Sequence, residues 1–309
     1  MGMDILYYSV LFVISIAVLL KASDWFIDSA ERIGLALGIS PFIIGVTIVA
    51  FGTSLPELAA SIVSVYAGES QLVVSNVVGS NITNIALVLG IAALVVKKIE
   101  LDYNIWHIDM PYLWGSSFLL YFTLYDQKLS TMECIVFLAG IVIFLGYSVS
   151  GDNQRSDVRT KINWKTYALL ILGGALVWGG ANYTIEAIKG LSAIAGIDSK
   201  IIGLSAVALG TSLPEVIVSI NAARRGKASI AVGNVLGSNI FNTYVVMAIP
   251  GLIGDLEIPD DIITYFLPMM IAMTLLFGVI SNNKKITRWE GTILLMFYAV
   301  FLIEIFKNI

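Results

Sequence analysis

The sequence GTSLPE occurs twice in the chain, at 52–57 and again at 210–215, and each copy ends in a glutamate. Glu57 and Glu215 lie near the middle of long apolar segments, where an ionised carboxylate without compensation costs roughly 3 kcal/mol or more. Neither segment offers a lysine or an arginine at a comparable depth. A bound cation would supply the missing positive charge. The alternative, a protonated glutamate that only ties helices together, leaves the duplication of the whole neighbourhood unexplained.

The residues just before each glutamate are suited to binding a cation. Pro56 and Pro214 have no N–H, and their rings crowd the carbonyl group four residues earlier, so we expect each helix to open upstream of its proline. The backbone carbonyls of Ala50 and Ala208 can then face a cavity instead of lipid. A hydroxyl one turn before the glutamate shares its helix face, although bonding to its own helix is the alternative. The hydroxyl residues are Thr53, Ser54, Thr211 and Ser212.

A second motif is also duplicated, as SNVVGSNITN at 75–84 and GNVLGSNIFN at 233–242. Each copy places an asparagine four residues after a serine, and this spacing puts both side chains on one helix face. The residues are Ser80 and Asn84 in the first copy and Ser238 and Asn242 in the second. The other duplicated asparagines, which we interpret as hydrogen-bond partners in helix packing, are Asn76, Asn81, Asn234 and Asn239.

Together these side chains supply two carboxylates with carbonyl, hydroxyl and amide oxygens, and no sulfur or imidazole. Such an oxygen set is typical of Ca²⁺ or Na⁺ sites and differs from the ligands of copper or zinc. Two glutamates match the charge of one Ca²⁺, and several Na⁺ ions could occupy the same oxygens in its place. The ions would then compete and alternate, which is how an antiporter works. We expect Ca²⁺ and Na⁺ as transported substrates and no organic cofactor.

The composition places these motifs in a membrane protein. Of the 309 residues, 58% are hydrophobic and only 13% are charged, whereas soluble domains carry about a quarter charged residues. The mean hydropathy is +0.88. The single cysteine, Cys134, excludes an internal disulfide framework, and the single histidine, His107, argues against a histidine relay. The fold class expected is therefore an all-α, polytopic membrane protein in a lipid bilayer.

Ten apolar segments have the length of a membrane-spanning helix, for which about 20 residues are needed. They lie near 5–30, 41–66, 72–96, 103–124, 129–149, 166–188, 199–223, 228–252, 262–281 and 289–307. In the sixth segment we expect close helix packing at four glycines, Gly173, Gly174, Gly179 and Gly180.

The positions of the basic residues predict the orientation of these ten segments. If the N-terminus is outside, the loops expected in the cytoplasm contain 13 of the 18 lysines and arginines. The predicted outer loop 255–261 is acidic instead. Because basic residues concentrate in cytoplasmic loops, this pattern predicts a multi-pass protein of the cell membrane with both termini extracellular.

The chain divides into two halves that resemble each other. GVTIVAFGTSLPELAASI at 45–62 aligns with GLSAVALGTSLPEVIVSI at 203–220, and the second motif aligns with the same offset of 158 residues. We therefore predict a first five-helix repeat at 1–149, a cytoplasmic linker at 150–165 and a second five-helix repeat at 166–309. Because five is odd, the second repeat must enter the membrane from the other side, as in the inverted repeats of secondary transporters.

The duplicated GTSLPE and GSN motifs resemble the α-repeats of the calcium/cation antiporter superfamily, most closely those of its sodium/calcium exchanger branch. The resemblance covers both halves and implies ten helices in two inverted five-helix repeats, with long first and sixth helices that slide across an ion-binding core. It also implies Na⁺/Ca²⁺ antiport, electrogenic calcium extrusion and a minimal, prokaryotic form, because the linker is too short for a calcium-sensing domain.

The resemblance implies a specific set of ion ligands. The glutamates would be shared by Ca²⁺ and Na⁺, and the other oxygens would complete sodium sites. Some family members, including potassium-dependent exchangers, have aspartate where Asn242 stands, so the resemblance argues against potassium co-transport here. The implied ligands are Ala50, Thr53, Ser54, Glu57, Ser80 and Asn84 from the first repeat, and Ala208, Thr211, Ser212, Glu215, Ser238 and Asn242 from the second.

Other functions remain as alternatives to Na⁺/Ca²⁺ exchange. A proton/calcium antiporter could use the same pair of glutamates, although that branch usually shows a different glutamate motif. A cation channel is a third hypothesis, but a site this rich in ligands would hold ions too tightly for fast passage. The chain has no P-loop, which argues against an ATP-driven pump. We expect neither an enzyme nor a nucleic-acid partner, and no obligatory protein partner.

Overall fold

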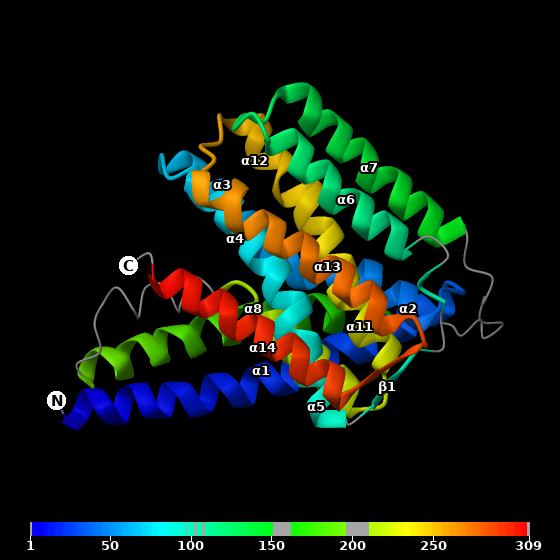
Figure 1. Ribbon diagram of the computed structural model, residues 1–309. Helices are drawn as coiled ribbons and strands as arrows, with labels where there is room; N and C mark the ends of the chain where they lie inside the picture. Colours follow the sequence, from blue (N-terminus) through cyan, green and yellow to red (C-terminus); the bar gives the residue numbers. More distant parts are fainter. Residues whose placement is uncertain are drawn as a thin grey trace.

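The computed structural model is a bundle of helices in which nearly every described residue outside the turns is helical (Figure 1). An apolar chain in a bilayer must satisfy its backbone hydrogen bonds internally, and helices do so within one segment. The structure describes residues 2–96, 98–101, 104–106, 109–150, 162–195 and 210–307.

Within the described residues, eight helical segments are long and apolar enough to cross a membrane. They coincide with eight of the ten segments expected from the sequence, which confirms a multi-pass membrane protein. The eight are Asp4–Ala36, Pro41–Tyr66, Gln71–Val96, Thr131–Ser148, Trp164–Ile194, Ala228–Ile253, Ile262–Ser281 and Arg288–Lys307.

The other two expected spans, 103–124 and 199–223, do not appear among these eight. Helix α6 (Asp109–Leu124) has 16 residues, which is short for a span, and the described part of the other segment contains only α10 (Leu213–Arg224). Residues 196–209 lie outside the described part of the chain. The number of ten helices therefore stays a prediction.

Four of the spans contain a wide π-helical turn between or before α-helical parts. Such turns are rare and short, and they occur frequently at functional sites. The four spans are α2 (Pro41–Ile44), η1 (Gly45–Val49) and α3 (Ala50–Tyr66); α4 (Gln71–Thr83), η2 (Asn84–Leu89) and α5 (Gly90–Val96); α11 (Ala228–Phe241), η3 (Asn242–Val246) and α12 (Ala248–Ile253); and η4 (Ile262–Phe266) with α13 (Leu267–Ser281).

Helix α11 occupies the centre of the bundle, and all of its residues from Ser229 to Phe241 are buried. Glycines let it approach the neighbouring span closely. A Cβ atom added to Gly45 would lie 2.4 Å from the carbonyl oxygen of Ile230, and one added to Gly237 would lie 2.2 Å from the carbonyl oxygen of Val46. The backbones of η1 and α11 are therefore in direct contact, which brings the two halves of the chain together at this point.

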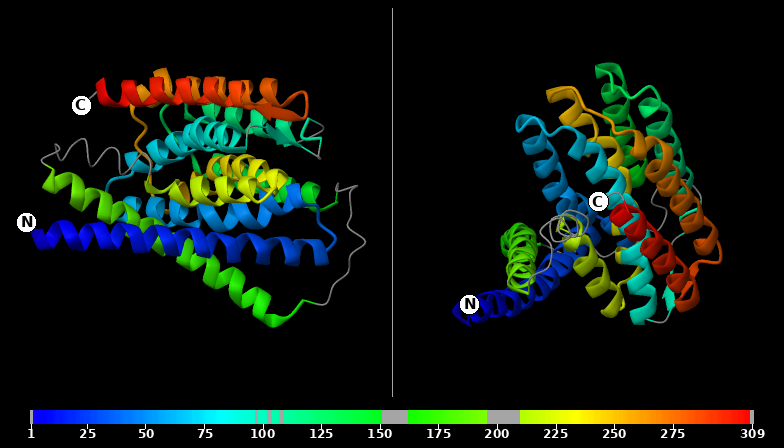
Figure 2. Two further views of the ribbon diagram at one scale, coloured as in Figure 1. Left: turned by 90° about the horizontal axis from the view of Figure 1, so that it is seen from below. Right: turned by 60° about the vertical axis from the view of Figure 1, so that its left-hand side comes forward.

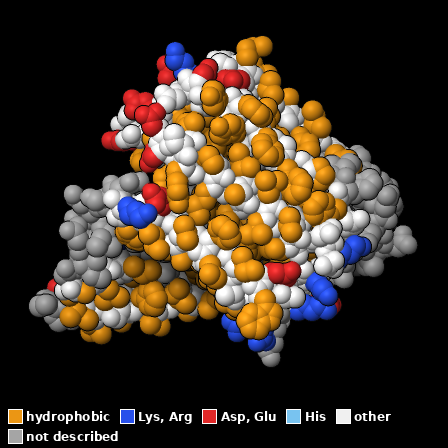
Figure 3. Space-filling model, viewed as in Figure 1, with side chains coloured by type: hydrophobic (Ala, Val, Ile, Leu, Met, Phe, Trp, Pro, Cys, Tyr) orange, Lys and Arg blue, Asp and Glu red, His pale blue; other side chains and the backbone are white. Residues whose placement is uncertain are grey.

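The outer helices present apolar side chains on the surface of the molecule. Helix α7 (Thr131–Ser150) and helix α14 (Arg288–Lys307) expose several large aliphatic residues, among them Val142, Ile143 and Val300. On the face shown in Figure 3, apolar side chains dominate, and acidic side chains gather near its upper left edge. Such a surface matches a hydrocarbon environment. A short antiparallel ribbon, β1 (Lys98–Glu100) with β2 (Lys285–Thr287), connects α5 to α14.

Charged residues attach α1 (Gly2–Ala36) to the turn between α10 and α11. Arg225 binds both carboxylate oxygens of Asp28, at 2.7 and 2.8 Å, and lies 3.3 Å from Asp24. Lys227 contacts Asp28 and lies 2.7 Å from Glu31. The hydrogen bond to Asp28 raises the pKa of Arg225, so the guanidinium stays charged. These pairs hold one end of α1 against the core of the bundle.

Helices α1 and α8 (Trp164–Ile194) pack along each other on the outside of the bundle (Figures 1 and 2). Glycines of α8 make the contact close: a Cβ atom on Gly173 would lie 2.9 Å from the backbone nitrogen of Phe26, and one on Gly180 would lie 3.0 Å from Leu19 Cβ. Close packing at these two glycines is confirmed. At Gly179, by contrast, an added Cβ atom would meet nothing within 4 Å.

This difference predicts opposite effects on stability when two glycines of α8 are replaced by alanine. Gly173→Ala forces the backbones of α1 and α8 apart and should lower the free energy of unfolding by about 1–2 kcal/mol. Gly179→Ala should be neutral or stabilising by up to about 1 kcal/mol, because alanine favours helix. Thermal unfolding of both variants in the same detergent, followed by circular dichroism, checks the prediction. Equal melting temperatures for the two variants would contradict the packing described here.

Candidate cation site

The two copies of GTSLPE adopt different local structures. In the first copy, α3 runs without interruption through Pro56, and the wide turn of η1 precedes the helix. In the second copy, α10 begins at Leu213, so Pro214 lies in its first turn, where the missing N–H has no helical partner to lose. An irregular backbone was expected upstream of each proline. In the first copy it lies further back, in η1, and in the second copy it is a non-helical turn at Thr211–Ser212.

The two asparagines of the second motif occupy equivalent places. Asn84 is the first residue of η2, and Asn242 is the first residue of η3. Both are almost fully buried, with 1% and 0% of their surface exposed. A π turn widens the helix at these residues, so that their side chains project from an irregular part of the backbone.

The two glutamates are buried close to each other. Glu57 is 1% exposed and Glu215 is fully buried, and their carboxylates are near enough to repel each other electrostatically. Ser54 Oγ donates a hydrogen bond of 3.0 Å to Glu215 Oε1. None of the described residues offers a hydrogen-bond partner to the other three carboxylate oxygens. Charged oxygens in this situation require compensation that the described side chains do not provide.

Three neutral oxygens of the candidate ligands share this property. Asn84 Oδ1, Asn242 Oδ1 and Ser238 Oγ are buried and have no partner among the described residues. Leaving a buried polar atom unpaired costs about 1–3 kcal/mol each. A cation bound among carboxylate, amide and hydroxyl oxygens would satisfy all of them at once, so this donor set fits Ca²⁺ or Na⁺.

Hydrogen bonds connect the motifs of the two halves across the bundle. Ser212 Oγ donates to Ser80 Oγ at 3.1 Å, and Thr211 Oγ1 donates to Asn76 Oδ1 at 3.0 Å. In the opposite direction, Thr53 Oγ1 donates to Asn234 Oδ1 at 3.2 Å. The candidate ligands of the two halves therefore meet at one junction of α3, α4, α10 and α11.

The structure describes eleven of the twelve candidate ligands, and Ala208 lies outside the described residues. The carbonyl oxygen of Ala50 lies 3.3 Å from Thr53 Oγ1, whose single hydrogen is used in the shorter bond of 3.2 Å to Asn234 Oδ1. The sequence predicts that the remaining duplicated asparagines are hydrogen-bond partners in helix packing, and each of them also forms a hydrogen bond with a candidate ligand. Their duplication was the signal that could have identified this role. These residues are Asn76, Asn81, Asn234 and Asn239.

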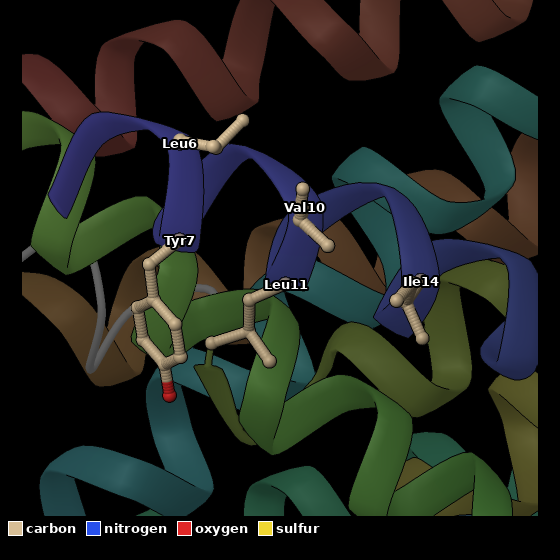
Figure 4. Close-up of a pocket in the computed structure, with 5 residues that line it drawn as sticks. All are labelled: Leu6, Tyr7, Val10, Leu11 and Ile14. Carbon is tan, nitrogen blue, oxygen red and sulfur yellow. The ribbon is translucent and has the colours of Figure 1, made fainter. Parts of the chain in front are cut away.

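The pocket in Figure 4 is unsuited to cations. It is a cavity of about 400 Å³ on the N-terminal part of α1, lined by aliphatic side chains and one tyrosine. Its residues are Leu6, Tyr7, Val10, Leu11 and Ile14. Nor do the described residues contain a cluster of three or more His, Cys, Asp or Glu side chains that could hold a metal ion. The paired glutamates with their neutral oxygens are thus the best candidate for a cation site in the described part of the chain.

The described residues thus form a multi-pass helical bundle whose centre holds buried carboxylate and amide oxygens without a partner among them, a donor set suited to cations. The chain belongs to the sodium/calcium exchanger family. The family model described as "Sodium/calcium exchanger protein" matches residues 7–150 and 165–307.

Named relatives and solved structures are similar over nearly the whole length. Sodium/calcium exchanger MaX1 of Methanosarcina acetivorans is 33% identical, over 93% of this chain and 95% of the relative. Putative antiporter CaxA of Alkalimonas amylolytica is 32% identical, over 96% and 97%. The backbone resembles that of the sodium-calcium exchanger NCX_Mj soaked with 2.5 mM Na⁺ and 0.1 mM Sr²⁺, with a TM-score of 0.84, 31% identity and coverage of 96% and 98%.

The uncompensated carboxylates predict how Glu57→Gln and Glu215→Gln alter stability. In a buffer free of Ca²⁺ and Na⁺, each substitution replaces one of two neighbouring buried acids by a neutral amide and should raise the free energy of unfolding. With Ca²⁺ at about a hundredfold excess over Kd, the wild-type protein should gain about 2.7 kcal/mol, whereas the variants should gain little. Thermal unfolding in detergent, with and without Ca²⁺, measures both effects. The exposed Glu69→Gln is the matched control, and a variant that kept the full calcium stabilisation would contradict the site.

Proposed function

We propose that this chain is a secondary active antiporter that exchanges Na⁺ for Ca²⁺ across the cell membrane by alternating access, with electrogenic extrusion of Ca²⁺. One observation carries the proposal: two neighbouring buried carboxylates, in a membrane protein, leave three oxygens without a partner among the described residues. Similar proteins that are named sodium/calcium exchangers support the choice of ions.

The site couples the two ions because both would use the same carboxylates. Ca²⁺ neutralises the pair alone, and Na⁺ ions can replace it only by occupying the same oxygens. If the empty site reoriented across the membrane, two neighbouring like charges would be buried in a medium of low dielectric constant, which is unfavourable. Each reorientation therefore requires a bound cation, and exchange follows from this requirement.

The proposed ligands combine oxygens of both halves. The two glutamates bind either ion, and the hydroxyl, amide and carbonyl oxygens complete the coordination. Buried, unpaired oxygens on Glu57, Asn84, Glu215, Ser238 and Asn242 support this assignment. The full set is Ala50, Thr53, Ser54, Glu57, Ser80, Asn84, Ala208, Thr211, Ser212, Glu215, Ser238 and Asn242.

In the proposed architecture, inverted five-helix repeats at 1–149 and 166–309 flank a cytoplasmic linker at 150–165, and both termini are extracellular. Equivalent hydrogen bonds support the repeat: the pair Thr53–Asn234 corresponds to Thr211–Asn76 when each residue is replaced by its counterpart 158 positions away. The peripheral pair α1 and α8 is the part that would move across the core.

The hydrogen bonds of the serine hydroxyls support alternating access, because they are not equivalent in the two halves. Ser54 donates to Glu215, but its counterpart Ser212 donates to Ser80 and leaves Glu57 without a partner among the described residues. A transporter whose site is open to one side of the membrane requires its two equivalent halves to be in different states. In the state open to the other side of the membrane, Ser54 and Ser212 would exchange these roles.

Flux through proteoliposomes tests the proposal. Ca²⁺ loaded inside should leave when Na⁺ is added outside, without a requirement for K⁺, and an imposed membrane potential should change the rate. Glu57→Gln and Glu215→Gln should abolish the flux, and Glu69→Gln should retain it. Efflux driven by a pH gradient in the absence of Na⁺ would favour a proton/calcium antiporter instead, and unitary currents would favour a channel.

A further inference from the structure

Eight of the proposed ligands, namely four serines, two threonines and two asparagines, carry a donor hydrogen as well as an acceptor oxygen, and four of the eight donate it across the two halves to a duplicated asparagine. The amide of asparagine has an NH₂ group beside its oxygen, and a threonine hydroxyl has one hydrogen. A cation is bound by oxygen lone pairs and repelled by an NH₂ group, so these side chains can serve only if their hydrogens point away. The four are Thr53, Asn84, Thr211 and Asn242.

The NH₂ group of each of the two asparagines donates a hydrogen bond to the facing helix. Asn84 Nδ2 donates to Asn239 Oδ1 at 3.0 Å, and Asn242 Nδ2 donates to Asn81 Oδ1 at 3.2 Å. The opposite ends of both amides, Asn84 Oδ1 and Asn242 Oδ1, are the buried oxygens without a partner among the described residues. The donor end of each amide is therefore used outside the site, and its oxygen is left for the site.

The orientation of Asn81 and Asn239 is itself fixed by backbone groups. Asn239 Nδ2 donates to the carbonyl oxygen of Asn81 at 3.2 Å, and Asn81 Nδ2 donates to the carbonyl oxygen of Asn239 at 3.5 Å and to Thr243 Oγ1 at 3.2 Å. A backbone carbonyl can only accept, so it determines which end of each amide is the nitrogen. The side-chain oxygen of each then faces Asn242 or Asn84.

The threonines follow the same rule. Thr53 donates to Asn234 Oδ1 and Thr211 donates to Asn76 Oδ1, each across the two halves. The nitrogens of these two asparagines are bound elsewhere. Asn234 Nδ2 donates to Ser219 Oγ at 2.9 Å, and Asn76 Nδ2 donates to Ser61 Oγ at 3.2 Å.

We propose that Asn76, Asn81, Asn234 and Asn239 are positioning residues that accept a hydrogen from each of these four ligands, so that the four present oxygen lone pairs to the ion. This inference rests on the proposed function, since it specifies how that same cation site is kept free of donors. None of the four touches the ion. Each acts through one ligand of the opposite half, and the loss of such a partner typically weakens metal binding roughly 10- to 100-fold.

A double-mutant cycle in the full-length protein tests one link. Asn239→Ala should raise the Ca²⁺ concentration for half-maximal flux by roughly 10- to 100-fold, because Asn84 is then free to turn its NH₂ group inward. Asn84→Ala should weaken binding as well. In the double variant, Asn239→Ala should add no further loss, because the ligand through which it acts is gone.

The control cycle combines Asn84→Ala with Asn234→Ala, which positions Thr53 instead, and here the two losses should multiply. The pair Asn81 and Asn242 repeats the test if a variant of the first pair does not fold. Multiplying losses for Asn239 and Asn84, or an unchanged Ca²⁺ dependence with only a lower melting temperature in Asn239→Ala, would overturn the inference. Wild-type protein that binds no Ca²⁺ would instead reject the proposed function, so the two failures are distinguishable.

Discussion

The burial of two carboxylates next to each other in an apolar bundle is the constraint on which the other features depend. Neither lipid nor aliphatic side chains can solvate a charge, and the like charges of Glu57 and Glu215 repel each other more strongly in a medium of low dielectric constant. Among the described residues, the protein surrounds the two carboxylates with neutral oxygens and places no lysine or arginine beside them. A mobile cation can then provide the balance, whereas a fixed basic side chain would neutralise the site permanently and leave nothing to transport.

The irregular helices follow from the same constraint. A regular helix satisfies its backbone internally and leaves no carbonyl group and little space for an ion. Here the wide turns η2 and η3 begin at Asn84 and Asn242, and α10 starts only after Thr211–Ser212. The glycine contacts between η1 and α11 bring these irregular places of both halves together. The site is therefore assembled from parts that neither half contains alone.

The features that follow from composition and from the duplicated motifs could be predicted from the sequence. Six of the eight spans were predicted within a few residues, and Glu57 and Glu215 were expected to meet because their motifs are identical. The length of α1, which extends to Ala36 instead of ending near residue 30, was missed because Arg225 and Lys227 neutralise its acidic residues from a distant turn. The directions of the asparagine amides were also hidden, since the partner across the bundle decides them.

Identical motifs do not give identical surroundings, and this difference is informative. Glu215 has a hydroxyl partner in Ser54, while the equivalent Ser212 turns to Ser80. The paired threonines and asparagines, by contrast, make equivalent bonds in both halves. The bonds that orient the candidate ligands are thus kept by both halves, and the bonds to the carboxylates differ between them. A site whose ligands stay oriented while its hydroxyl contacts exchange can bind the same ions in either state and still distinguish one side of the membrane from the other.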